Sequence, residues 1–109
     1  MEGQEAAQGA TELQASLDRV DGERRFVIKN VGTVSAHDVR FTVKAERDKN
    51  SPVSAHDLTT AFPVAELKPD EDVSLGAIIT PGTGLHFRGV VTWRNPDGTA
   101  EERVFYMSA

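Results

Sequence analysis

The tetrapeptide Ser-Ala-His-Asp occurs twice, at residues 35–38 and 54–57, and a third histidine stands at position 86. Imidazole and carboxylate groups are ligands that zinc accepts, so these residues could in principle hold a metal ion. The sequence contains no His-x-His or His-x-x-x-His pattern, which would place two imidazoles on one face of an element. We therefore expect no metal site and interpret His37, His56 and His86 as solvent-facing side chains.

Ser35, His37 and Asp38 also have the side-chain types of a hydrolase triad. A triad needs the base within hydrogen-bond reach of the nucleophile and an acid behind the base. Adjacent residues of a strand point to opposite faces, so Asp38 should point away from His37. The chain has no Gly-x-Ser-x-Gly turn and no phosphate-binding loop. We expect no catalytic residue and predict that the protein is not an enzyme.

Residues 70–72 read Asp-Glu-Asp and, together with Asp18, Asp21 or Glu23, could bind calcium. The run lacks the alternating Asp-x-Asp spacing of a calcium loop. An acidic cluster of this kind is typical of a solvated turn. We therefore predict neither a metal nor any other cofactor.

Charged and aromatic side chains cluster in the strand-like segments. We expect the arginines to form cross-strand ion pairs on a solvent face with Glu101 and Glu102; they are Arg24, Arg25, Arg88, Arg94 and Arg103. Trp93 is expected in the core. Phe105 and Tyr106 are the strongest candidates for an exposed aromatic, because adjacent strand residues cannot both face inward.

Composition limits the classes of protein to which this chain can belong. The 109 residues fit one domain, and the 17 acidic and 12 basic residues give a net charge of −5. This balance argues against nucleic-acid binding and against attraction to an anionic membrane. The absence of cysteine excludes disulfides and thiol chemistry. No apolar run is long enough to span a bilayer, and the first residues do not resemble a signal peptide.

Period-two alternation of apolar side chains dominates the chain from Glu12 onward. Residues 1–11 carry little apolar surface and are predicted to form a flexible tail or linker, which leaves 12–109 as the folded domain. Asp21-Gly22 is a two-residue hairpin signal, and Pro63 places its strand at a sheet edge. The alternation predicts about seven strands and no helix; they fall near 12–20, 23–30, 38–46, 60–67, 72–80, 85–94 and 99–107.

Seven short strands separated by turn signals are typical of an all-β, seven-stranded antiparallel immunoglobulin-like β-sandwich. Its predicted core consists of the inward apolar residues, which are Leu13, Leu17, Phe26, Ile28, Val39, Phe41, Val43, Val64, Leu67, Val73, Leu75, Ile79, Val91 and Trp93. The long polar segment 47–58 and the Gly/Pro segment 80–84 are predicted loops and candidate contact regions.

In the connection Asn30–Val39, packing can explain the type of each residue. Gly32 suits a positive-φ position, and the Asn30 side chain can bond to nearby backbone groups. Ala36 is small enough to lie beneath the turn. Val31 and Val34 are expected to close the end of the core.

The run Phe26–Val43 resembles the hydrophobic-x-Asn-x-Gly-x-x-x-Ala-x-x-Val signature of bacterial and archaeal immunoglobulin-like modules, and the CARDB family (cell-adhesion-related domain found in bacteria) in particular. The family's Leu-x-Pro-Gly step, which leads into an alternating strand, is matched by Leu67, Pro69 and Val73, with Asp70 in place of the glycine. Its last strand-turn-strand resembles residues 91–107. The resemblance covers residues 12–108 and implies an immunoglobulin-like fold, but it carries no catalytic residue.

Three functions stay open at this point. The resemblance favours a non-catalytic accessory or protein-interaction module of an envelope-associated or membrane-anchored bacterial protein, contacting its partner through an edge strand or the end loops. The second is a module that binds a divalent metal or a glycan. The third is a structural spacer or self-associating domain. We expect a protein partner, no nucleic acid and no membrane insertion by this chain, and leave its oligomeric state open.

Overall fold

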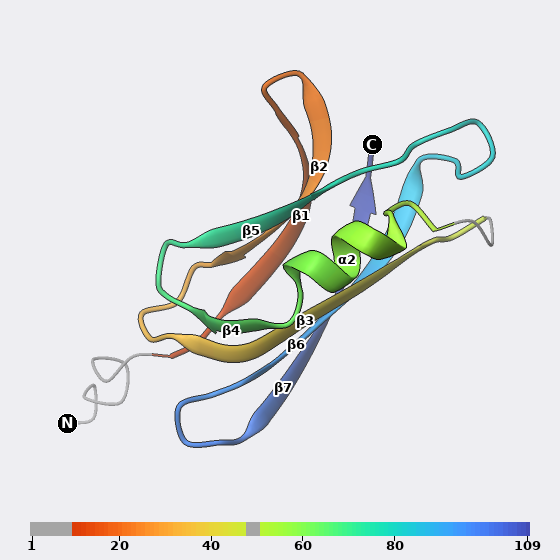
Figure 1. Ribbon diagram of the computed structural model, residues 1–109. Helices are drawn as coiled ribbons and strands as arrows, with labels where there is room; N and C mark the ends of the chain where they lie inside the picture. The colour runs from red at the N-terminus through yellow and green to blue at the C-terminus, as the bar shows by residue number, and fades with distance from the viewer. Residues whose placement is uncertain (1–9, 48–50) are drawn as a thin grey trace.

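Two antiparallel sheets, stacked face to face, make up the computed structural model, which describes residues 10–47 and 51–109 (Figure 1). The first sheet has the order β1-β2-β5, comprising β1 (Leu13–Val20), β2 (Glu23–Asn30) and β5 (Asp72–Gly76). The second has the order β4-β3-β6-β7, comprising β4 (Val64–Leu67), β3 (Ala36–Ala45), β6 (His86–Arg94) and β7 (Ala100–Ser108). This arrangement confirms the predicted seven-stranded antiparallel β-sandwich.

The core lies between the sheets and follows the predicted alternation. Phe26 of β2 packs on Phe41 of β3 and Phe87 of β6, with ring centroids 6.1 and 5.6 Å away. Ten of the predicted core residues are buried, and Leu17, Val64, Val73 and Ile79 are partly buried against them. Trp93 is 1% exposed, as predicted. The core also contains large side chains that the sequence analysis did not include, namely Val53, Phe62, Phe87 and Met107.

Turn chemistry joins neighbouring strands where the sequence indicated. Asp21 and Gly22 have φ of 52° and 85° between β1 and β2, the left-handed pair that a tight hairpin requires. Gly98 takes φ of 90° between β6 and β7. β4 is an edge strand directly after Pro63, as predicted from the missing backbone donor of proline.

The fifth strand is shorter than predicted. β5 ends at Gly76. The Ala77 amide still donates to the Arg24 carbonyl of β2 at 2.9 Å, in the register of the β2–β5 pair, but the Ile78 amide donates to the carbonyl of Pro52, outside the sheet. Apolar alternation through Ile79 therefore reflects packing against the end of the core rather than a longer strand.

The prediction of a helix-free chain is wrong in the segment after β3. Residues 48–50 lie outside the described residues, and α2 (Ala55–Ala61) follows them. The Ser54 hydroxyl caps this helix by accepting a hydrogen bond from the Asp57 amide, and the acidic Asp57 sits in the first turn. Leu58 and the buried Phe62 and Val53 then hold the segment against the core. α2 contacts β5, the edge strand of the first sheet (Figure 1).

Asn30 joins the two sheets through a buried side chain. Its amide nitrogen donates to the carbonyl of Leu67 on β4 at 2.9 Å and to that of Val34 at 3.0 Å. Its side-chain oxygen accepts from the Gly32 amide at 2.9 Å. The residue is 0% exposed, so no water can replace these bonds. The predicted bonding of Asn30 to nearby backbone is confirmed and extends across the sandwich.

Gly32 is required for close approach rather than for a positive φ, so the expected reason was wrong. It is not among the positive-φ glycines, which are Gly22, Gly84 and Gly98. A Cβ at Gly32 would lie 2.6 Å from the Glu12 backbone nitrogen and closer still to the Ala10 carbonyl oxygen. The chain before β1 therefore crosses directly over the connection, and the Thr33 amide donates to the Ala10 carbonyl at 2.9 Å. Val31, expected to close the core, is 42% exposed.

The positive φ in this region belongs to Asp70, at 69°. It stands where the CARDB-like step has glycine, and aspartate is one of the few other residues that adopts this conformation readily. The conformation lets the Asp70 amide donate to the backbone carbonyl of Asn30 at 2.8 Å. The two turns at this end of the sandwich are thus bonded to the same asparagine.

We predict that Asn30→Ala lowers the free energy of unfolding by about 2–4 kcal/mol, because it leaves buried carbonyl and amide groups unpaired. Urea unfolding followed by far-UV circular dichroism measures this loss. Asn95→Ala is the matched control: the Asn95 side chain also makes three hydrogen bonds, but it is half-exposed and water can replace them, so the loss should be about 1 kcal/mol or less. Equal losses in the two variants would contradict the assigned role of Asn30.

Candidate interaction surface

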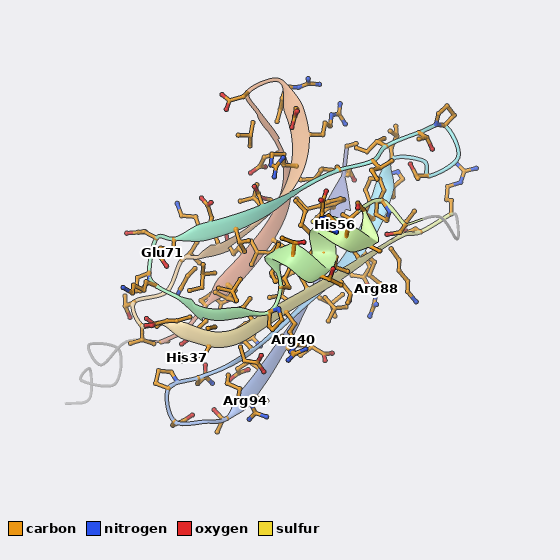
Figure 2. All side chains as sticks on the ribbon, viewed as in Figure 1. His37, Arg40, His56, Glu71, Arg88 and Arg94 are labelled. Atoms are coloured by element: carbon orange, nitrogen blue, oxygen red, sulfur yellow. The ribbon has the colours of Figure 1, made fainter. Side chains whose placement is uncertain are left out.

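The three histidines lie on separate elements. His37 is in β3, where it faces Glu66 and Arg94 on the neighbouring strands. His56 is exposed on α2, away from His37 (Figure 2). His86 begins β6, and its Nδ1 lies 3.1 Å from the Ser108 hydroxyl. Within residues 10–47 and 51–109, no group of three or more His, Asp or Glu residues is placed to hold a metal ion.

Ser35, His37 and Asp38 are not assembled as a triad. Asp38 has a φ of 50° in an irregularity of β3, where the pairing with β6 shifts between His37 and Arg40. Its carboxylate forms an ion pair with Arg40 at 3.2 Å rather than contacting His37. The carbonyl of Ser35 accepts a hydrogen bond from the Thr11 hydroxyl at 3.2 Å. The motif therefore serves the turn and bulge that begin β3.

The acidic run 70–72 forms a turn with internal bonds. The Glu71 carboxylate accepts from the Lys68 amide at 2.8 Å, and Asp72 faces Lys29 across the β2–β5 pair. The β1–β2 register sets Val20 beside Glu23, at the far end of the sheet from Asp72. Asp21 and Glu23 are therefore at the opposite end of the sheet from this turn, and do not join the acidic run in a calcium site.

A polar network that the sequence analysis missed organises the β6–β7 turn. Trp93 Nε1 donates to Asn95 Oδ1 at 3.2 Å, and the Asn95 amide nitrogen donates to Thr99 Oγ1 at 2.9 Å. The Thr99 amide and hydroxyl both donate to Asp97, at 3.0 and 2.7 Å. These two bonds, the backbone one first, lower the pKa of Asp97. The Asn-Pro-Asp-Gly sequence indicates the turn but not the contacts of its side chains.

The same network reaches Glu12, the residue before β1, through Arg103. Its guanidinium carbon lies 5.4 Å from the Trp93 ring centroid, and the group pairs with Glu101 at 3.1 Å and Glu12 at 3.8 Å. The Asn95 amide, and then Arg103, lower the pKa of Glu101. All these groups have structural partners, so the cluster fixes the turn and the edges of the two sheets.

A shallow groove of about 650 Å³ lies at the hairpin end of the first sheet. Its lining includes Glu23, Arg24, Asp57, Ile78 and Leu85. Ile78 and Leu85 are 46% and 54% exposed. The groove has apolar walls and mixed charges, but no polar side chain is buried within it to orient a small ligand. In the predicted contact loop 80–84, the Thr83 hydroxyl is buried and donates to the Thr80 carbonyl at 2.9 Å.

Among the described residues, β7 presents the longest edge that has no ladder partner, although β7 also contacts β1, and Arg103 pairs with Glu12 just before β1. β7 has nine residues and pairs only with β6 in the described structure. Val104 and Tyr106 point outward and are 38% and 73% exposed, so Tyr106 confirms the prediction of an exposed aromatic. Phe105 instead faces inward and packs against the core. The run Val104–Met107 is uncharged, whereas charges usually protect a sheet edge from pairing.

The outer face of the second sheet is arranged in rows by strand register. One row consists of Lys44, Arg88 and Tyr106 on β3, β6 and β7; the next two are Thr42, Val90 and Val104, then Arg40, Thr92 and Glu102. Figure 2 shows Arg40, Arg88 and Arg94 on this sheet.

The expected cross-strand ion pairs of the arginines are not formed. The register sets Arg88 beside Lys44 and Tyr106, and Arg94 beside His37 and Ala100. Among the described residues, the ion pairs join Glu23 to Arg25 and Asp38 to Arg40, and join Arg103 to Glu12 and to Glu101. Arg88 and Arg94 therefore present their charge to solvent.

The chain matches no family model, and no curated protein or solved structure was found to be similar to it. The resemblance to CARDB modules stays a prediction. No helix in the described part of the chain is both long and apolar enough to cross a membrane. Among the described residues, the outer face of the second sheet and the edge of β7 form the candidate interaction surface.

We predict that Thr99→Val raises the pKa of Asp97 toward its ordinary value while leaving it lowered, since the stronger backbone bond remains. Carboxyl NMR titration measures this change. Thr59→Val is the matched control, because the Thr59 hydroxyl donates to carbonyls of α2 and should leave Asp97 unaffected.

The pKa values of Asp97 and Glu101 are lower in the folded chain, so their contribution to stability is complete above the unfolded pKa. This contribution to stability is lost as the pH falls below about 4 and through the pKa values of the folded chain. Acid unfolding of Thr99→Val should therefore begin at a higher pH than that of the wild type. An unchanged Asp97 titration would contradict the assigned network.

Proposed function

We propose that this chain is a non-catalytic, immunoglobulin-like interaction module that binds a partner protein through the free edge of β7 and the adjoining outer face of the β4-β3-β6-β7 sheet. The observation that supports it is the exposed, uncharged half of β7, in which Tyr106 is 73% exposed. Unpaired backbone groups on a sheet edge bind an added strand, and the side chains beside them select its sequence.

The other three edge strands are less suited to this role. β4 has only four residues and follows Pro63. β5 has five residues and is contacted by α2. β1 is long enough, but its outward side chains from Gln14 to Asp18 are polar, and its one exposed apolar side chain, Val20, is the last residue before the hairpin turn. Tyrosine and arginine, which flank the β7 edge, are the side chains that dominate many protein interfaces.

The setting of the module is proposed on sequence resemblance alone. The run Phe26–Val43 resembles the signature of CARDB modules, and this supports an accessory domain of an envelope-associated or membrane-anchored bacterial protein. The fold itself hosts many functions, so the partner surface rather than the fold carries the functional argument.

Site-specific photo-crosslinking tests the proposal. A photoreactive phenylalanine analogue at position 106 should crosslink to a protein in the native cell, and the same analogue at Ser16, on the outer face of the first sheet, should not. Excess wild-type chain should compete for the crosslink, whereas Tyr106→Asp should compete poorly, because its buried charge would oppose docking. Equal crosslinking from both positions, or none from position 106, would overturn the proposal.

A further inference from the structure

Lys44 and Arg88 face each other across β3 and β6 with no acidic partner. They are direct neighbours in the strand register, and both are exposed. Like charges directly opposite each other destabilise a sheet. Over the described residues, neither cation forms an ion pair. This row of the free sheet therefore carries a repulsion that an added negative charge would relieve.

Charge pairing elsewhere in the sandwich shows that this row is unusual. On the outer face of the first sheet, Asp18 faces Arg25 and Lys29 faces Asp72. Arg19 and Arg24 are also neighbours, but Arg19 Nη1 donates to the Gly22 carbonyl at 3.1 Å and so is bonded within the hairpin. Lys44 and Arg88 have no such local acceptor among the described residues. Glu46 is in the next row of the same face, beside His86, but in the described part of the chain it forms no ion pair with either cation.

We infer that the partner segment that pairs with β7 carries a glutamate or aspartate opposite Tyr106, that Arg88 binds this carboxylate, and that the positive charge of Lys44 beside Arg88 strengthens the attraction. The inference rests on the proposed function, since it assumes that a strand adds at this edge. An added strand extends the row to Lys44, Arg88, Tyr106 and the partner residue. Strands are about 4.8 Å apart, so the partner residue lies about 10 Å from Arg88. Arginine can lie on the Tyr106 ring and reach that carboxylate.

The neighbouring rows specify two more positions of the partner. A residue opposite Val104 extends the row of Thr42, Val90 and Val104, and should be apolar. A residue opposite Glu102 should be basic, because an opposite charge stabilises a cross-strand pair. An antiparallel partner therefore reads acidic, apolar and basic at alternate positions along its chain.

A protein segment fits this surface better than a nucleic acid or a membrane. Binding to a nucleic-acid backbone commonly uses about 6–10 cationic contacts, and an anionic membrane about 4–8 clustered Lys or Arg residues. Here Glu102 shares the face with the cations, Asp38 neutralises Arg40, and the chain has a net charge of −5. Two unpaired cations beside Tyr106 and Val104 match a single carboxylate within an apolar interface.

The test uses two peptides of the sequences Thr-Glu-Thr-Val-Thr-Lys-Thr and Thr-Gln-Thr-Val-Thr-Lys-Thr, which differ only in the acidic residue. Amide NMR titration of the full chain should show shifts along β7 and at Lys44 and Arg88, with the glutamate peptide binding about fivefold tighter than the glutamine peptide at low salt. High salt should abolish that preference. Heparin and anionic phospholipid vesicles are the competing probes.

The double variant Lys44→Gln/Arg88→Gln should remove the preference for the glutamate peptide. Arg19→Gln/Arg24→Gln is the matched control, because it removes the same charge from the facing arginine pair of the first sheet and should retain the preference. A preference that survives loss of Lys44 and Arg88 would overturn the inference. Binding of heparin or vesicles through these two cations, without binding of the glutamate peptide, would overturn it as well.

A stability measurement tests the repulsion independently of any ligand. Lys44→Glu places a carboxylate opposite Arg88 and should raise the midpoint of thermal unfolding by about 1–6 °C. The same variant should lose its preference for the glutamate peptide. A lower or unchanged midpoint would show that the two cations do not repel in the folded chain, and the argument for an anionic partner would fail.

Failure of the inference differs from failure of the proposed function. If both peptides shift the β7 resonances equally, strand addition stands and selection by charge is wrong. If neither peptide shifts them and no protein crosslinks to position 106, docking at this edge is wrong and both proposals fail.

Discussion

The buried amide of Asn30 is the interaction on which the arrangement of the sandwich depends. It belongs to β2 in the first sheet, yet its side chain bonds to Leu67 at the end of β4 in the second and to the connection that leads into β3. The backbone of the same residue bonds to the turn before β5, through the Glu71 carbonyl and the Asp70 amide. One residue therefore bonds to backbone groups of three chain segments, which are the end of β4, the connection into β3 and the turn before β5.

This junction explains how a chain without disulfides holds its two sheets in a fixed position relative to each other. Side-chain amides supply both donors and acceptors, so Asn30 can pair carbonyls and an amide at once in a site closed to water. Bonds of this kind are directional, whereas apolar packing is not. The aromatic contacts of Phe26 hold the layers together, and Asn30 fixes how one end of them is aligned.

The edge strands of the two sheets differ in how well they are protected from pairing with another strand. A proline precedes β4, α2 contacts β5, and polar side chains line the outer face of β1. β7 has charged residues in its first half only, and its second half has exposed apolar side chains beside two cations without acidic partners. Natural sheets usually protect such an edge, so its exposure is better explained by binding than by stability.

The sequence predicted the fold well because period-two alternation and turn residues act locally. Asp21-Gly22, Pro63 and the alternation through Phe41 depend on neighbours that the sequence shows directly. Gly32 was misinterpreted because its constraint comes from Ala10 and Glu12, which only the folded chain brings near it. The helix α2 was missed although Ser54 and Asp57 carry its capping signal, because the segment appeared merely polar.

The candidate surface was only partly predictable. The exposure of Tyr106 follows from strand alternation, but the neighbours of Arg88 depend on the register of three strands that are distant in sequence. To predict that Arg88 faces Lys44 rather than a glutamate, the register of these strands must be known to the exact residue. For the same reason, Asp97 and Glu101 could be placed near a turn, while their hydrogen bonds could not be assigned.

Amide hydrogen exchange of the 109-residue chain tests most directly the claim that a sandwich aligned by Asn30 leaves the β7 edge open. The Gly32 amide, bonded to the buried Asn30 side chain, should exchange only through global unfolding. Alternate amides of β7 should exchange far faster, because they point away from β6 and have no strand to bond with. Uniform protection along β7, equal to that of β6, would show that another strand already occupies the edge and would contradict the account.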